Sequence, residues 1–239
     1  MKILEKDPPL AEECVRPWII VPFLYPLSSA GLTHISIFTF GPTLLILFHR
    51  LLLVHVPFGS LIFLAGFTLF IGYGIYYITF CVFDSSKANT SARQIPQIYF
   101  PDKWEMLRQY FLIFASAAIC FFPAGSYFAY FLQKDLWFWI LSGCGLFFFP
   151  MALLSAILFD AINELSPIFL VVSIFKAFIG YLKLLLFFYI AGGFIVFVLL
   201  QVHIPGFISH GIIFYLLMVL ANRLGWFYWW YKSKLGWGI

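Results

Sequence analysis

Histidine is the residue type in this chain most able to bind a metal ion or haem, and there are five of them. A neutral imidazole ring ligates zinc, copper or haem iron where several ligands converge. No two of these histidines have the i,i+4 spacing that would place two ligands on one helix face. Four of them fall near one predicted membrane face, namely His49, His55, His203 and His210, with His34 apart. A site between the first and last helical hairpins is an alternative, but scattered interfacial histidines are the favoured interpretation. We therefore predict no metal site and no cofactor.

Acidic side chains that could act as general acids or bases cluster in one polar loop, residues 83–105. Asp84, Asp102 and Glu105 are interleaved there with basic residues, which is typical of a solvated, salt-bridged loop. The chain lacks the G-x-x-x-x-G-K-[ST], H-E-x-x-H and G-x-S-x-G motifs. It also lacks the paired aspartates that metal-dependent lipid head-group transferases require. We therefore predict that the protein is not an enzyme and has no catalytic residue.

Five basic residues are candidates for contact with a partner or with lipid. Arg93 and Arg108 belong to the polar loop and its end, where they could dock another protein. Lys176 and Lys183 lie seven residues apart near the start of a long apolar run. Arg223 is the deepest charge in the chain. It could extend toward the inner headgroups or hold an anionic lipid, and the first interpretation is favoured.

The elements that position these residues must lie in a membrane, because the composition excludes a fold whose surface is covered by water. The chain of 239 residues is 63% hydrophobic and 10% charged, with a mean hydropathy of +0.99. About a quarter of the residues of a soluble domain are charged, so this chain cannot cover a water-exposed surface. Its net charge of +4 matters for membrane orientation, and we expect no nucleic-acid partner.

Apolar runs of at least ~17 residues predict an all-α polytopic membrane protein with about six transmembrane helices. The predicted spans are residues 31–53, 58–82, 106–132, 136–159, 181–202 and 207–230. Residues 167–179 are too short to span and predict an amphipathic helix in the interface. The chain thus divides into a cytoplasmic segment with an interfacial lead-in (1–30), a first transmembrane hairpin (31–82), a cytoplasmic loop (83–105) and a four-helix half (106–239).

Basic residues predict that both ends of the chain are cytoplasmic, because Lys and Arg stay on the inner side of short loops. Only Arg50 and Lys134 then fall outside. The other twelve fall inside: Lys2, Lys6, Arg16, Lys87, Arg93, Lys103, Arg108, Lys176, Lys183, Arg223, Lys232 and Lys234. All eight tryptophans also lie at predicted span boundaries, where indole rings prefer to sit.

A resemblance emerges around the polar loop. Gly72-Tyr73 late in a span, then Ile95-Pro96, Asp102 and Trp104 before a new apolar helix, resemble a broad class of uncharacterised bacterial multi-pass proteins grouped as a domain of unknown function. The similarity covers about residues 58–132. It implies a bacterial inner-membrane location and brings no activity with it.

The function that these features favour is a non-catalytic accessory subunit of a larger membrane complex. Its expected partners are membrane lipids and other membrane protein subunits. The alternative is a small transporter or lipid-handling protein. That alternative would use helices broken at Pro42, Pro123 and Pro150, since unwound helices can build binding sites.

Overall fold

The structure is a computed structural model, and it describes residues 20–55, 59–92, 103–160, 166–201 and 205–237. The described residues form α-helices and one 3-10 turn, with no strand among them. Two short elements open the described chain: α1 (Val21–Leu24) and η2 (Tyr25–Leu27). Arg93 and His203 lie outside the described residues.

Within the part of the chain that the structure describes, six helices are long and apolar enough to cross a bilayer. They are α2 (Ser29–His55), α3 (Gly59–Ser85), α4 (Lys103–Phe131), α5 (Leu136–Phe159), α7 (Phe178–Gln201) and α8 (Gly206–Leu235). The prediction of an all-α membrane protein with six spans is therefore confirmed. Because the signal is a contiguous apolar run, the observed helices differ from the predicted spans chiefly in extending by a few residues at their polar ends.

The prolines inside α2, α4 and α5 do not unwind these helices. Pro42, Pro123 and Pro150 each lie within a continuous helix. Each proline removes one backbone hydrogen bond, and membrane helices tolerate this loss where local adjustment satisfies the freed carbonyl. The expectation of helices broken at these positions is therefore not met.

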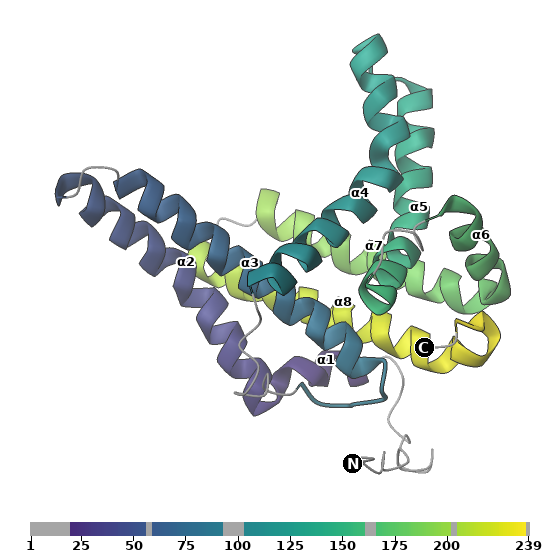
Figure 1. Cartoon of the computed structure of the whole chain (residues 1–239), viewed down its shortest axis with the longest axis horizontal. Helices are drawn as coiled ribbons and strands as arrows, with labels where there is room; N and C mark the ends of the chain where they lie inside the picture. The colour runs from purple at the N-terminus through teal and green to yellow at the C-terminus, as the bar shows by residue number, and fades with distance from the viewer. Residues whose placement is uncertain (1–19, 56–58, 93–102, 161–165, 202–204, 238–239) are drawn as a thin grey trace.

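Segments predicted to share the cytoplasmic side are in contact with one another at one end of the helices (Figure 1). The Tyr25 hydroxyl donates to Asp84 at the end of α3 (3.3 Å), and the Ala92 amide donates to the Tyr25 carbonyl (3.4 Å). Arg108 near the start of α4 pairs with Asp160 just after α5. Two spans separate the segments in each of these pairs, and an even number of crossings returns the chain to the same side of a membrane.

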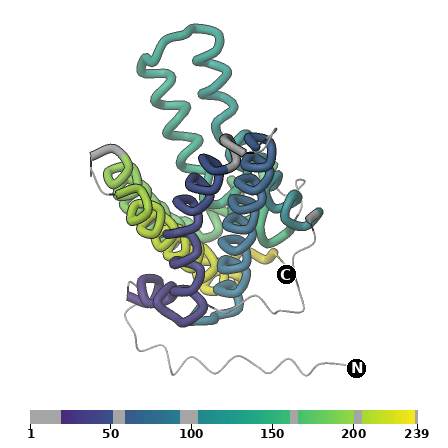
Figure 2. Tube along the Cα trace, turned by 90° about the vertical axis from the view of Figure 1, so that its left-hand side faces the viewer, coloured from purple at the N-terminus to yellow at the C-terminus, as the bar shows by residue number. Residues whose placement is uncertain are grey.

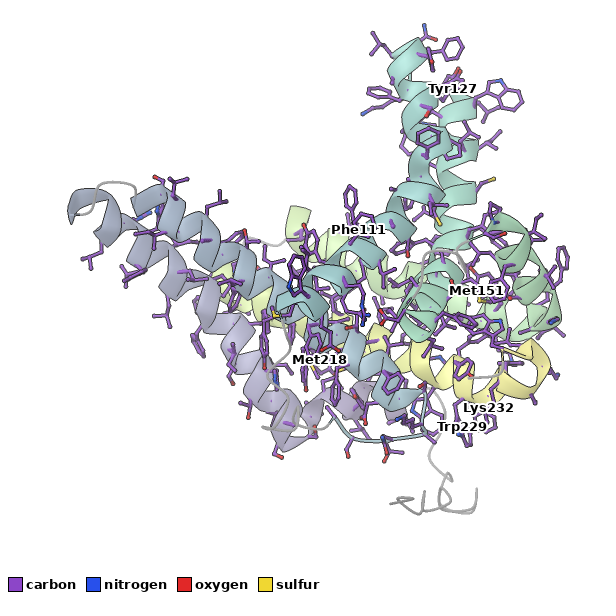
Figure 3. The ribbon with its side chains drawn as sticks, viewed as in Figure 1. Phe111, Tyr127, Met151, Met218, Trp229 and Lys232 are labelled. Carbon is purple, nitrogen blue, oxygen red and sulfur yellow. The ribbon has the colours of Figure 1, made fainter. Side chains whose placement is uncertain are left out.

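The centre of the molecule is α8, which packs against α2, α3 and α7. Met218 on α8 and Met151 on α5 are fully buried and belong to one hydrophobic core (Figure 3). The Cα trace in Figure 2 shows the α4–α5 hairpin extending beyond the other helices. Beyond this core the α2–α3 hairpin and the α4–α5 hairpin diverge (Figure 1). Tyr127 labels the outer part of the second hairpin in Figure 3, far from both methionines. The outer halves of these hairpins therefore expose broad apolar faces.

The short helix α6 (Pro167–Lys176) is held by the end of the chain that follows α8. The indole nitrogen of Trp237 donates to the Ser173 hydroxyl (3.1 Å), and the Lys176 ammonium donates to the Leu235 carbonyl (3.0 Å). The opposite side of α6 carries exposed Ile168 and Phe175. One face thus packs on protein while the other is apolar, as expected of a helix lying against lipid. It ends at Lys176, three residues before the predicted boundary at 179.

Candidate functional site

A basic cavity lies between the first turns of α7 and the last turns of α8. Its volume is about 380 Å³. The residues that line it are Gly180, Lys183, Leu184, Arg223, Phe227, Trp230, Tyr231 and Lys234. Three of these eight are cationic and none is acidic, so the lining of the cavity favours an anion.

Helical spacing explains why these residues face one another. Arg223, Phe227, Trp230 and Lys234 follow one another on α8 at intervals of three or four residues, so they share one face of that helix. Gly180 makes the close approach of α7 possible, since an added Cβ there would lie under 3.0 Å from the ring of Tyr231. The missing side chain thus lets an α8 aromatic ring form one wall of the cavity.

Cations occupy both the mouth and the deep part of this cavity. The Lys234 ammonium lies 5.7 Å from the centroid of the Tyr231 ring, near the end of α8. The Arg223 guanidinium carbon lies 5.8 Å from the centroid of Phe187, one helical turn beyond Lys183 on α7. The guanidinium is therefore held beside α7, at the level where the neighbouring Asn222 contacts Ser85 at the end of α3, and does not extend to the end of α8.

The neighbouring face of α8 carries a buried polar cluster that the sequence reasoning missed. Asn222, fully buried, donates to the Ser85 hydroxyl of α3 (2.8 Å). Asp84, next to Ser85, accepts from Tyr25 (3.3 Å) and from the Asn89 side-chain amide (2.6 Å). Burial, with the neighbouring Cys81 and Asp84, raises the pKa of Tyr25 well above its usual range, so this hydroxyl remains a donor. The cluster fixes α8 against α3 and η2.

His34, which was set apart from the other histidines, is a buried packing residue. Its Nε2 lies 2.8 Å from the Tyr73 hydroxyl and its Nδ1 lies 2.8 Å from the Ala30 carbonyl oxygen. Its ring stacks on Tyr77 with centroids 3.6 Å apart. His49 stacks on Phe63 (4.2 Å). Within the described ranges, no group of three or more His, Cys, Asp or Glu side chains could hold a metal ion.

Comparison with known proteins gives no relative from which a role could be transferred. No protein-family model, curated protein or solved structure matches this chain. Any role of the cavity and of the polar cluster therefore follows from the chemistry of their own residues.

The structure separates four of the five basic candidates into two groups. Lys183 and Arg223 line the cavity together. Arg108 instead pairs with Asp160, which also accepts from the Gln109 amide (3.2 Å), and Lys176 donates to the Leu235 carbonyl. Arg108 and Lys176 therefore join parts of the same chain. Arg93 is not among the described residues.

Proposed function

We propose that this protein is a non-catalytic accessory subunit of a larger membrane protein complex. The observation that supports the proposal is a set of membrane-embedded glycines that no described part of the chain packs against. In lipid, helices associate through close van der Waals packing, and small residues at the interface allow that close approach. A glycine without an internal neighbour is then expected to meet a helix of another subunit.

Most of the span glycines in this chain fall into two sets. For one set, an added Cβ would lie under 3.0 Å from another described segment, so the chain itself uses the missing side chain: Gly41, Gly74, Gly145, Gly180, Gly211 and Gly225. For the other set, an added Cβ would meet nothing within 4 Å: Gly66, Gly125, Gly143, Gly192 and Gly193. Glycine inside a helix costs about 1 kcal/mol relative to alanine. The second set carries this cost without any packing gain inside the chain.

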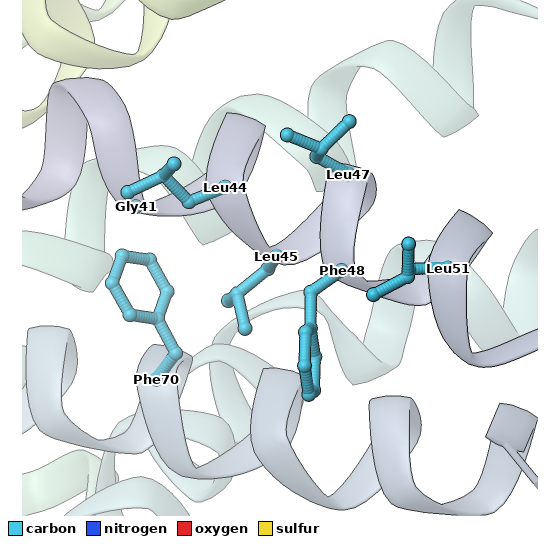
Figure 4. A pocket seen from close by; sticks show the side chains of 7 residues that line it. All are labelled: Gly41, Leu44, Leu45, Leu47, Phe48, Leu51 and Phe70. Atoms are coloured by element: carbon cyan, nitrogen blue, oxygen red, sulfur yellow. The ribbon is translucent and has the colours of Figure 1, made fainter. Parts of the chain in front are cut away.

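The exposed apolar surface supports the same proposal. Between the outer halves of α2 and α3 lies an apolar groove of about 700 Å³ (Figure 4). Gly41 leaves space there for the ring of Phe70, and Leu45 and Phe48 also line the groove. All of its lining side chains are hydrocarbon, so it can accept an apolar side chain or an acyl chain but has no group for chemistry.

A size measurement tests the proposal. We expect the chain extracted from its native membrane in a mild detergent to migrate with other membrane subunits. Replacing Gly192 and Gly193 by leucine should release it as a smaller species, because the added side chains fill the space where a partner helix would pack. Leu61→Phe, which also adds bulk at an exposed position but replaces no glycine, should leave the assembly intact.

Two results would contradict the proposal. One is a wild-type chain that leaves the membrane as a monomer. The other is an assembly of unchanged size after both glycine substitutions in a chain that still folds.

A lipid-handling role is the second candidate, and the basic cavity between α7 and α8 favours it. A transporter that relies on proline-broken helices has less support, because Pro42, Pro123 and Pro150 lie inside continuous helices. A bacterial inner-membrane location is proposed on the resemblance of residues 58–132, and cell fractionation tests it.

A further inference from the structure

We propose that the cavity between α7 and α8 binds the phosphate-bearing headgroup of an anionic membrane lipid. This inference is independent of the accessory role and concerns the residues that line that cavity. Lys183 and Arg223 are the cations that would contact the phosphate, and Lys234 lies at the mouth. Phosphate oxygens accept charge-assisted hydrogen bonds from ammonium and guanidinium groups.

The position of Arg223 supports an anion site. An arginine whose guanidinium only avoids contact with hydrocarbon would extend toward the nearer lipid headgroups. Here the guanidinium lies beside Phe187, one helical turn farther into the span than Lys183. Its neighbour Asn222 contacts Ser85 at the predicted cytoplasmic end of α3, so the guanidinium lies at the level of the lipid headgroups, where basic pockets between helices bind anionic lipids. The guanidinium borders a cavity that an anion could enter from the end of the helices.

The mixed lining of the cavity favours a lipid over a free anion. The cations share the cavity with the hydrocarbon side chains of Leu184 and Phe227 and with Trp230. A small inorganic anion would leave these walls without a partner. A lipid places its phosphate on the cations while its glycerol and upper acyl carbons cover the apolar wall.

The surface of α7 next to the cavity is apolar and exposed. One and two turns farther along α7 from Lys183 lie Leu186 and Ile190, which are 62% and 66% exposed. Spacings of three and four residues place them on the same side of the helix as Lys183. Acyl chains of a lipid whose headgroup enters the cavity can therefore lie along α7.

The level of the site agrees with the predicted topology. The cavity lies at the start of α7 and the end of α8, where Trp229 and Lys232 mark the last turns of α8 (Figure 3). This is the end of the molecule predicted to face the cytoplasm. Clusters of basic residues with aromatic rings at that level are typical of sites for anionic headgroups.

Native mass spectrometry of the full chain tests the proposal. The wild-type protein is released from nanodiscs that contain equal amounts of phosphatidylglycerol and phosphatidylcholine, and the retained lipid is counted. We expect one retained phosphatidylglycerol, favoured at least about tenfold over phosphatidylcholine, because a lost charge-assisted contact weakens binding by about that factor. Equal retention of both lipids would overturn the proposal without the use of any variant.

Two charge-matched double variants locate the site. Lys183→Gln with Arg223→Gln should abolish the preference. Lys87→Gln with Lys232→Gln removes the same charge from exposed residues outside the cavity lining and should preserve it. Circular dichroism establishes that each variant is helical. Equal loss in both double variants would show attraction by general surface charge and would contradict a defined site.

A third arm separates the two sources of phosphate. Wild-type protein in nanodiscs of phosphatidylcholine alone is titrated with inorganic phosphate. We expect no binding at millimolar phosphate. Saturable binding that Arg223→Gln removes would assign the cavity to a soluble anion and would overturn the lipid assignment.

Discussion

Asn222 on α8 donates a hydrogen bond of 2.8 Å to the Ser85 hydroxyl at the end of α3. The two residues are 137 positions apart in the sequence, and both are fully buried. The Asn222 side-chain oxygen has no hydrogen-bond partner among the described residues. The contact thus joins the first hairpin to the last, beside the helix face that carries the basic cavity.

A double-mutant cycle should measure this contact. Asn222→Ala and Ser85→Ala are each expected to lower the free energy of unfolding by about 1 kcal/mol or more. Their coupling should be near 0.6 kcal/mol, the usual size for hydrogen bonds between membrane helices. Unfolding in mixed micelles provides the values. Strictly additive effects would mean that the hydrogen bond contributes nothing to stability.

Alanine substitution should destabilise the chain at glycines that contact another segment of the chain, but not at glycines that face outward. At Gly225 an added Cβ would lie under 3.0 Å from backbone atoms of Val82 and Ser86, which cannot rotate away. Gly225→Ala should therefore destabilise the isolated chain by roughly 1–3 kcal/mol. Gly193→Ala should be neutral or stabilising by up to about 1 kcal/mol, since it only improves helix propensity. Equal losses at both sites would contradict the division of the glycines.

Acidic pH should destabilise the turn between α4 and α5, because it protonates the Asp135 carboxylate. This carboxylate accepts from the Tyr127 hydroxyl (2.5 Å) and from the Phe138 amide (3.1 Å), and these bonds hold its pKa below the usual 3.8. A depressed folded-state pKa stabilises the fold above pH 3.8, and the stabilisation is lost as the pH falls through the folded value.

Thermal unfolding at pH 7 and pH 3 provides the comparison. Asp135→Asn retains an acceptor for the helix N-terminus but has no proton to gain. It should therefore show a smaller drop in Tm between the two pH values than the wild type. An identical drop would exclude Asp135 as a source of the acid sensitivity.

Chemical labelling of single cysteines should establish the orientation of the chain in the membrane. With the native cysteines replaced by alanine, Thr90→Cys and Ser233→Cys are predicted to face the cytoplasm, and Gln133→Cys the opposite side. A membrane-impermeant maleimide added to intact cells should label residue 133 alone, and all three after permeabilisation. Labelling of residues 90 and 233 from opposite sides would refute six spans with both ends inside.

The six spans could be predicted because their signal is local. An apolar run of sufficient length must form a helix in lipid, whatever it packs against. The partners of polar side chains are not local. Arg108 was a candidate for docking another protein, yet it pairs with Asp160 across the α4–α5 hairpin. Reversing its charge would therefore disturb the chain itself, and it is a poor probe of partner binding.

The residues of the cavity could be predicted only in part from the sequence. Lys183 and Arg223 were each identified as possible lipid contacts from charge and depth. Their convergence depends on Gly180 admitting the ring of Tyr231, which is a property of how α7 and α8 pack. The Asn222–Ser85 contact had only one sequence signal, a lone amide within an apolar run. The fit of two helices decides whether such an amide faces a partner or lipid.

Photocrosslinking from α7 tests the accessory role most directly. A benzophenone amino acid replaces Phe197, which is 54% exposed and lies one turn from Gly193, in the native membrane. The same group at Phe227, which is buried inside the chain, is the control. The proposal predicts a defined adduct between Phe197 and another membrane protein, and none from Phe227. Adducts to lipid alone from Phe197 would contradict it.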